Sequence, residues 1–274
     1  MNIHLILQMA ADSMPDREAV ICGSQRLTYQ DLSDAVNSLA DKLEGTKKLA
    51  YLAETGTAAP VAMFAAALRG IPYVPINYRL AEDQITSLLK RVSPALLISD
   101  DAPEVEGITK ITPAEVFSPG TPWEGFAPDE EGSIAIELFT SGTTGDPKSA
   151  ILRHDNLMAY ILGTIEFMSA EESQSTLVSV PPYHIAGISA ILSSVYAGRR
   201  MVQLPNFSPE AWLKLAKQEN VSQAFLVPTM LQRIIEYTAS NNETLDLPAM
   251  QAIAYGGGKM PHSVIEQAMM LMPH

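Results

Sequence analysis

Short apolar runs alternate with stretches of helical periodicity in the N-terminal part of the chain, and this alternation constrains the fold most strongly. The apolar runs at 49–53 and 95–98, and a third run that begins at Tyr73, are typical of strands. The segments 58–69 and 82–92 have helical spacing. Repeated strand–helix–strand units predict a parallel sheet with right-handed crossovers and helices on both faces. The expected fold class is therefore α/β, with layered parallel or mixed sheets flanked by helices.

Three local patterns precede this region. A short opening helix is predicted by the shared helical face of Ile3, Ile6, Leu7 and Ala10. A hairpin is expected over 19–28, with its turn at Gly23 and Ser24. Thr28 is typical of a helix N-cap, and the apolar residues that follow it keep helical spacing.

A segment rich in proline, glycine and acidic residues at 118–132 is the best linker candidate. We therefore expect two α/β subdomains, at 1–132 and 133–274. In the second, strands are predicted at 176–180, 201–204, 224–227 and 251–254, and helices at 185–196, from Ser208, and at 230–237. A further helical face is formed by Leu157, Tyr160, Ile161, Thr164, Ile165 and Met168.

The run Thr140–Lys148 carries four hydroxyls, two glycines and one lysine in nine positions, directly after the apolar segment 134–139. Glycines let backbone N–H groups converge on an anion, and hydroxyls add donors that can rotate. This composition predicts a phosphate-binding loop. A Walker A loop has the same lysine spacing, but it requires a glycine where this chain has Pro147, which has no N–H to donate. A Walker lysine also opens a helix, whereas 149–152 is typical of a strand.

The sequence Thr-Ser-Gly-Thr-Thr-Gly-Asp-Pro-Lys at 140–148 resembles the phosphate loop of the adenylate-forming superfamily. That superfamily contains acyl-CoA synthetases, peptide-synthetase adenylation domains and firefly luciferase. The resemblance implies that ATP phosphates are held by Thr140, Ser141, Gly142, Thr143, Thr144, Gly145 and Lys148. The family usually has glycine after the lysine, where this chain has Ser149. The alternative interpretation is a polar hairpin turn without a ligand.

The segment 181–187 resembles the family pattern P-x-x-H-x-x-G. The resemblance places His184 beside the acyl pocket and the reacting phosphate, as a catalytic residue. A histidine that merely ends a strand is the alternative. Peptide-synthetase domains typically carry Phe-Asp here, so His184 argues against an amino-acid substrate. The segment 70–80 also resembles the acyl-CoA synthetase branch, and we interpret it as scaffold.

The glycines Gly256, Gly257 and Gly258 follow another apolar strand. Ligands of open α/β sheets bind beyond the carboxyl ends of the strands, and a turn without side chains can lie against a planar ring. The segment resembles the family's glycine-rich turn, which lines the adenine and acyl sites. A flexible hinge is the alternative, and Lys259 is assigned no role.

Charge and cysteine content exclude several classes of function. The formal net charge is −13 and the pI is about 4.8, so nucleic acid and anionic membrane surfaces are not expected partners. The single cysteine, Cys22, allows no intramolecular disulfide, which favours a reducing compartment and an inert thiol. Neither a signal peptide nor an apolar run long enough to span a membrane is expected. These features predict a cytoplasmic location.

The resemblance implies an ATP-dependent ligase that converts a small carboxylic acid to its acyl-adenylate, releasing pyrophosphate, and then to a thioester of coenzyme A. ATP, Mg²⁺ and coenzyme A are the implied cofactors, and no metal ligand is assigned in this chain. The glutamate that holds Mg²⁺ in the family, the ribose-binding aspartate and the domain with the catalytic lysine have no counterpart before His274. The resemblance thus covers the N-terminal portion only. A nucleotide- or partner-binding module without catalysis, and an acyl-AMP ligase serving a carrier-protein thiol, are the alternatives. Assembly as a homodimer is left open.

Overall fold

The computed structural model describes residues 1–140, 148–241 and 245–272. Within these ranges the strands form two six-stranded sheets. The first has the order β12-β11-β9-β10-β1-β2 and is parallel except for the β1–β2 hairpin. Its strands are β1 (Glu18–Cys22), β2 (Gln25–Thr28), β9 (Ser175–Val178), β10 (Arg200–Gln203), β11 (Gln223–Leu226) and β12 (Ala252–Tyr255).

The second sheet has the order β6-β5-β3-β4-β7-β8 and is parallel except for the β7–β8 hairpin. Its strands are β3 (Leu49–Tyr51), β4 (Tyr73–Pro75), β5 (Ala95–Ile98), β6 (Ile108–Ile111), β7 (Ile134–Thr140) and β8 (Lys148–Arg153). Neither β6 nor the short 3-10 helix at Glu115–Phe117 that follows it was predicted. The predicted α/β class with parallel sheets is confirmed.

The helices are α1 (His4–Ser13), α2 (Tyr29–Lys42), α3 (Ala58–Leu68), α4 (Glu82–Val92), α5 (His154–Thr164), α6 (Ile185–Ala197), α7 (Pro209–Gln218), α8 (Pro228–Asn241) and α9 (His262–Leu271). Local capping sets several of their ends. Thr28 and Asp31 form a capping box at the start of α2, and the Ser208 hydroxyl accepts the Ala211 N–H at the start of α7. Gly198 ends α6 in the left-handed conformation. α9 was not predicted.

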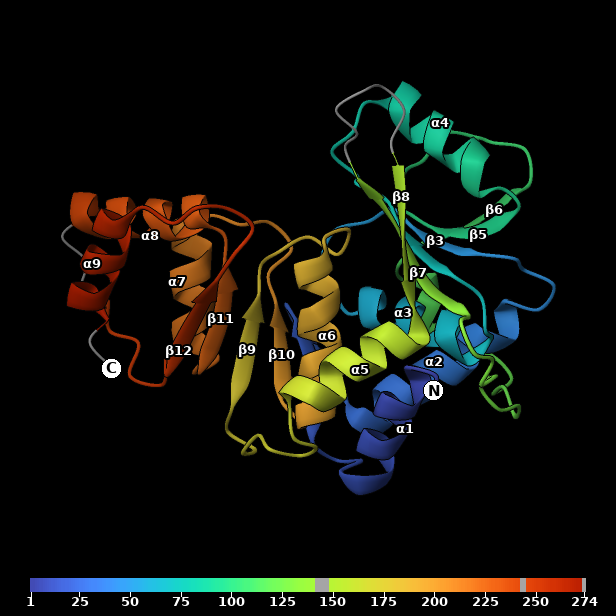
Figure 1. Cartoon of the computed structure of the whole chain (residues 1–274), viewed down its shortest axis with the longest axis horizontal. Helices are drawn as coiled ribbons and strands as arrows, with labels where there is room; N and C mark the ends of the chain where they lie inside the picture. The colour runs from blue at the N-terminus through green and yellow to red at the C-terminus, as the bar shows by residue number, and fades with distance from the viewer. Residues whose placement is uncertain (141–147, 242–244, 273–274) are drawn as a thin grey trace.

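The two sheets lie on either side of a layer of helices (Figure 1). One core cluster joins buried residues of α1, α2, α3, α5 and α6 with residues from both sheets. On the outer face of the second sheet, α4 packs over β3, β4 and β5, and on the outer face of the first, α7, α8 and α9 pack over β9, β10 and β11. Successive residues of β3 illustrate the arrangement, because Leu49 and Tyr51 face the central helices and Ala50 faces α4.

The sheets do not correspond to the sequence ranges 1–132 and 133–274. β1 and β2 join strands from the second range, and β7 and β8 join strands from the first. Each half of the chain therefore contributes one hairpin to the sheet formed mainly by the other half. The division into two subdomains at 132 stays a prediction.

The helical face expected between Leu157 and Met168 is partly wrong. α5 ends at Thr164, and its buried apolar side chains are Leu157, Met158 and Ile161. Tyr160 is 49% exposed, because the buried positions His154, Leu157, Met158 and Ile161 share one face of the helix and Tyr160 lies beside that face.

The segment 118–132 contains no helix or strand, as expected of a linker, yet side chains fasten it to the central helices. The guanidinium carbon of Arg69 lies 3.8 Å from the ring centroid of Trp123. The Asn2 side-chain amide donates to the carbonyls of Ala67, at 3.0 Å, and Pro128, at 2.9 Å. Pro128 also packs against Gly70, where an added Cβ would lie 2.3 Å from the proline ring. The linker is therefore a packed part of the fold.

This contact predicts different costs for two glycine substitutions. Gly45 and Gly70 both have positive φ, at +73° and +65°, but only Gly70 has atoms within 4 Å of the position of a Cβ. Gly45→Ala should lower the free energy of unfolding by about 1–2 kcal/mol through backbone strain alone. Gly70→Ala should cost about 1–3 kcal/mol more because it overpacks against Pro128. Urea unfolding of both variants measures the difference. Equal losses of unfolding free energy would show that Pro128 moves away to accommodate the added Cβ.

His154 at the start of α5 is 2% exposed, and burial lowers its pKa to about 4. Its Nδ1 accepts the Ile3 N–H at 3.2 Å, so the neutral ring carries its proton on Nε2. The nearby amino group of Met1 lowers the pKa further, whereas Asp155 and Asp129 oppose the shift. His4 on α1 is also buried, and burial alone lowers its pKa to about 4.

These two histidines predict a loss of stability in mild acid. An unfolded histidine takes up its proton near pH 6.5, whereas the folded ones do so only near pH 4, so the stabilisation is complete above pH 6.5 and is lost as the pH falls toward 4. Each contributes up to about 3 kcal/mol over this range. Urea unfolding between pH 7 and pH 4 measures the slope. His154→Gln should make the slope shallower, and an unchanged slope would contradict the assignment.

Candidate functional site

The two ends of the predicted phosphate loop lie opposite each other in the β7–β8 hairpin. Thr140, the last residue of β7, is paired with Lys148, the first residue of β8, and its hydroxyl donates to the Lys148 carbonyl at 3.3 Å. Ser141, Gly142, Thr143, Thr144 and Gly145 lie outside the described residues. Lys148 therefore opens a strand and not a helix, which confirms the rejection of a Walker A loop.

Ser149, the departure from the family pattern, has a structural role in this hairpin. Its hydroxyl donates to Glu137 Oε1 at 2.8 Å, and the Lys48 ammonium lies 2.7 Å from Glu137 Oε2. Successive residues of a strand point to opposite faces, so Lys148 points away from this pair. The Lys148 residue is exposed, and the described residues offer it no ion pair. Ser149 thus fixes the strand, and Lys148 presents its charge at the mouth of the hairpin.

His184 occupies the turn between β9 and α6. It is the N-cap residue of α6, and its carbonyl accepts the N–H groups of Gly187 and Ile188 at 3.0 Å and 3.3 Å. Its own N–H donates to the Pro181 carbonyl at 3.1 Å. A Cβ on Gly187 would lie 2.8 Å from that carbonyl oxygen, so only glycine fits. This close approach gives a physical reason for the spacing of proline, histidine and glycine in the motif.

Aromatic rings connect His184 to the end of β4. The His184 ring lies 4.6 Å from the Tyr183 ring, which meets the Tyr78 ring edge-to-face at 5.4 Å and 76°. Arg79 lies 5.5 Å from the Tyr78 ring centroid. Burial, and then the charge of Arg79, lower the pKa of His184, which favours the neutral imidazole. The segment 70–80 was interpreted as scaffold, although its position at the carboxyl end of a predicted parallel strand was a usable signal.

Gly256, Gly257 and Gly258 follow β12 as predicted. A Cβ on Gly256 would lie 3.1 Å from the Phe225 ring, and Gly257 has a φ of +80°, so each position favours glycine for its own reason. The Gly256 N–H donates to the Leu226 carbonyl at 3.3 Å, which continues the pairing of β12 with β11. Gly257 and Gly258 are exposed. The turn is open to a ligand on one side.

The three predicted segments share one topological position but not direct contacts. Each follows a strand of a parallel array, at the ends of β7, β9 and β12. Among the described residues, ring contacts join His184 to the end of β4, in the same sheet as β7. The hydrogen bonds and ring contacts of those residues do not link Thr140 or Lys148 to His184, nor either of these to Gly256–Gly258.

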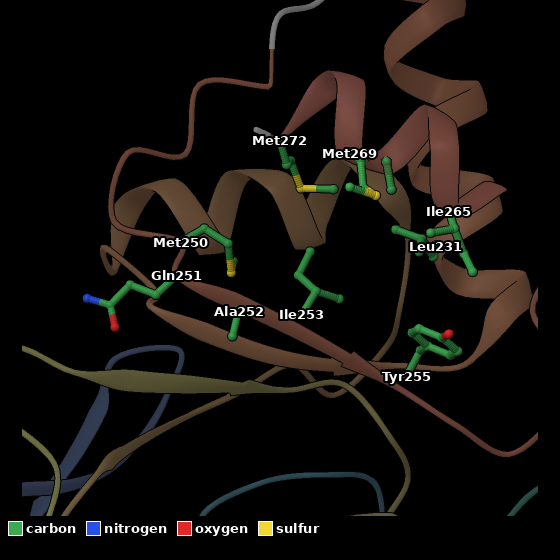
Figure 2. Close-up of a pocket in the computed structure, with 10 residues that line it drawn as sticks. Leu231, Met250, Gln251, Ala252, Ile253, Tyr255, Ile265, Met269 and Met272 are labelled. Atoms are coloured by element: carbon green, nitrogen blue, oxygen red, sulfur yellow. The ribbon is translucent and has the colours of Figure 1, made fainter. Parts of the chain in front are cut away.

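An apolar groove that the sequence analysis did not predict lies beside β12 (Figure 2). It has a volume of about 210 Å³ and lies between β12 and the helices α8 and α9. Three methionines from two segments of the chain surround it, Met250 before β12, and Met269 and Met272 at the end of α9. Tyr255, which directly precedes the glycine turn, also lines it. The groove therefore extends to the residue before the predicted adenine and acyl wall, and Gly256–Gly258 do not line it.

Two further observations bear on cofactors and location. Across residues 1–140, 148–241 and 245–272, no group of three or more histidine, cysteine, aspartate or glutamate side chains could hold a metal ion. No Mg²⁺ ligand is assigned among these residues. No helix in the same ranges is long and apolar enough to cross a membrane.

Comparison with known proteins identifies the family. The pattern of the AMP-binding enzyme family matches residues 7–274, and the chain belongs to this family. It is 26% identical to the 2-succinylbenzoate–CoA ligase of Bacillus cereus, over 95% of this chain and 55% of the relative. It is 24% identical to a fatty acid–acyl-carrier-protein ligase of Streptomyces coeruleorubidus, over 96% of this chain and 54% of the relative.

Among solved structures, the fold is similar to that of the O-succinylbenzoate coenzyme A synthetase of Bacillus subtilis in complex with AMP. The TM-score is 0.84 at 24% identity, over 97% of this chain and 56% of the other. The predicted membership of the adenylate-forming superfamily and the predicted fold are thus confirmed. The chain spans about half the length of the curated relatives that it matches.

Proposed function

We propose that this chain is the N-terminal part of an ATP-dependent carboxylate-activating ligase. In the reaction, a carboxylate oxygen attacks the α-phosphate of ATP, pyrophosphate leaves, and a thiol then takes the acyl group from the acyl-adenylate. The β7–β8 hairpin carries the proposal, because it presents the exposed cation of Lys148 opposite Thr140 at the ends of a predicted phosphate loop.

Each predicted residue has a role in this proposal. Lys148, with Thr140 and the loop between them, would hold the β- and γ-phosphates of ATP. His184 would border the acyl carboxylate. Because its pKa is lowered, its ring would be neutral and would not form an ion pair with the attacking carboxylate oxygen. Gly256–Gly258 would form the adenine and acyl wall. Charge develops mainly on phosphate, so positioning and neutralisation should dominate catalysis.

The proposal extends to the substrate, the acyl acceptor, the metal ion, the location and the assembly state. The acid is a small carboxylic acid, and an aromatic or a fatty acid fits the names of the relatives. Coenzyme A is the proposed acceptor, and a carrier-protein thiol is the alternative. Mg²⁺ would neutralise the phosphates on ligands outside the described residues. The single cysteine supports a cytoplasmic location, and a homodimer stays a prediction.

Pyrophosphate exchange tests the activation step directly. Incubation of the protein with Mg²⁺–ATP, labelled pyrophosphate and either 2-succinylbenzoate or a medium-chain fatty acid should return label to ATP with at least one acid. Titration calorimetry with ATP is run in parallel. ATP binding without exchange for any acid in a wider panel would favour the nucleotide-binding module, and the absence of both would reject the proposed function.

Lys148→Ala should distinguish a phosphate clamp from a general nucleotide contact. Loss of a charged contact to phosphate should weaken ATP binding by about tenfold or more, and AMP binding much less, because AMP lacks the β- and γ-phosphates. Calorimetric dissociation constants for both nucleotides measure the effect. Lys214→Ala, an exposed lysine on α7, makes the same change of net charge and should leave both constants unchanged. Equal weakening of ATP and AMP would contradict the clamp.

A further inference from the structure

Two loops, one from each sheet, bring aromatic side chains into contact next to His184. Tyr78 follows β4 in one sheet, and Tyr183 follows β9 in the other. Their rings are perpendicular within 14° (interplanar angle 76°) and 5.4 Å apart, and Tyr183 in turn contacts the His184 ring at 4.6 Å. Tyr78, Tyr183 and His184 therefore form a continuous aromatic bridge, the term used below for these three residues.

Backbone hydrogen bonds fix both ends of the aromatic bridge. On the β4 side, the Ile76 N–H donates to the Tyr51 carbonyl at 2.8 Å, and the Asn77 side chain accepts the Arg79 N–H at 2.9 Å. These bonds hold Tyr78 in a short turn. On the β9 side, the hydrogen bonds of His184 with Pro181 and Gly187 hold the other turn. The rings are thus presented to one another by rigid backbone.

The His184 side chain itself has little else to orient it. The residue is exposed, and no side-chain hydrogen bond is found for it in the described part of the chain. An exposed imidazole without partners samples several rotamers, whereas packing against a fixed ring selects among them. Tyr183 can act as that fixed ring because it is only 8% exposed and is packed edge-to-face by Tyr78.

We propose that Tyr78 is a positioning residue for His184, holding the Tyr183 ring so that the imidazole keeps one orientation toward the acyl site. The role in the acyl site rests on the proposed function, whereas the orientation of the ring does not. Arg79, whose guanidinium carbon lies 5.5 Å from the Tyr78 ring centroid, adds a positive charge to the same cluster. The segment 70–80 then has a role in the site besides that of scaffold.

Nuclear magnetic resonance of His184 tests the orientation without substrate. The chain has five histidines, and His184→Gln identifies the resonances of this one by their loss. In the wild-type protein the ring protons of His184 should be displaced by the ring current of Tyr183. Tyr78→Leu should reduce that displacement and move the pKa of His184 toward its ordinary value of 6.5, because it loosens the Tyr183 ring that shields one side of the exposed imidazole from water. Among the described residues, Tyr183 contacts this ring and the charge of Arg79 acts on it, whereas Tyr78 contacts Tyr183.

Three further variants serve as controls for the role of the Tyr78 ring. Tyr78→Phe keeps the ring and should keep the wild-type resonances, and Tyr78→Met keeps the apolar volume without a ring and should behave as Tyr78→Leu. Phe167→Leu breaks another aromatic pair of similar ring separation, in which Phe167 lies 5.3 Å from Tyr196 at an interplanar angle of 50°, so it controls for a general loss of stability. Unchanged His184 resonances in both Tyr78→Leu and Tyr78→Met would overturn the proposal.

The exchange assay tests the consequence for the reaction. Tyr78→Leu should reduce kcat/KM for the acid by about two- to tenfold, which is the range set by one aromatic pair, and leave the KM for ATP unchanged. Tyr78→Phe should restore the wild-type value. A parallel rise in the KM for ATP would overturn the positioning role. If the wild-type protein shows no exchange, the proposed function fails, and the resonances alone then decide whether Tyr78 orients His184.

Discussion

The helical layer between the two sheets is the constraint on which the rest of the structure depends. All residues of α3 are buried, and α2 packs directly against it. A helix that is apolar all round is stable only when other elements surround it. The alanines of α3 allow this, since their small side chains let neighbouring elements approach closely. Each sheet therefore buries one face on the same helices, and the linker at 118–132 is fastened along their edge through Asn2 and Arg69.

This layering determines where chemistry can occur. Parallel strands place their carboxyl ends along one edge of a sheet, and the helices that cover the faces leave that edge open. The end of β7 carries Thr140, the end of β9 leads to His184, and the end of β12 leads to the glycine turn. Because these strands belong to two sheets, a site formed by all three segments would depend on contacts between the sheets. The aromatic bridge supplies one such contact, from Tyr78 to His184.

Elements with a complete local signal could be predicted closely. The helix at 82–92 and the strand at 95–98 have the predicted bounds, because charged residues, a proline and an apolar run mark their ends. β6 was missed because its four residues include a threonine and a lysine, so it lacks an apolar run. Tyr160 was misplaced because spacing gives several candidate faces, and only the packed neighbours select one. The role of Ser149 needed Glu137 and Lys48, which lie far from it in sequence.

The sequence by itself determined the α/β class, the family and the residues of the three motifs. These depend on local chemistry, namely glycines that permit close approach, hydroxyls and a lysine suited to phosphate, and the periodicity of apolar residues. Only the tertiary structure decided that hairpins are exchanged between the two halves of the chain. It likewise decided that Tyr78 lies against Tyr183, more than a hundred residues away. The physical reason is that sheet order and cross-sheet contacts arise from the shared burial of distant segments, which no local pattern encodes.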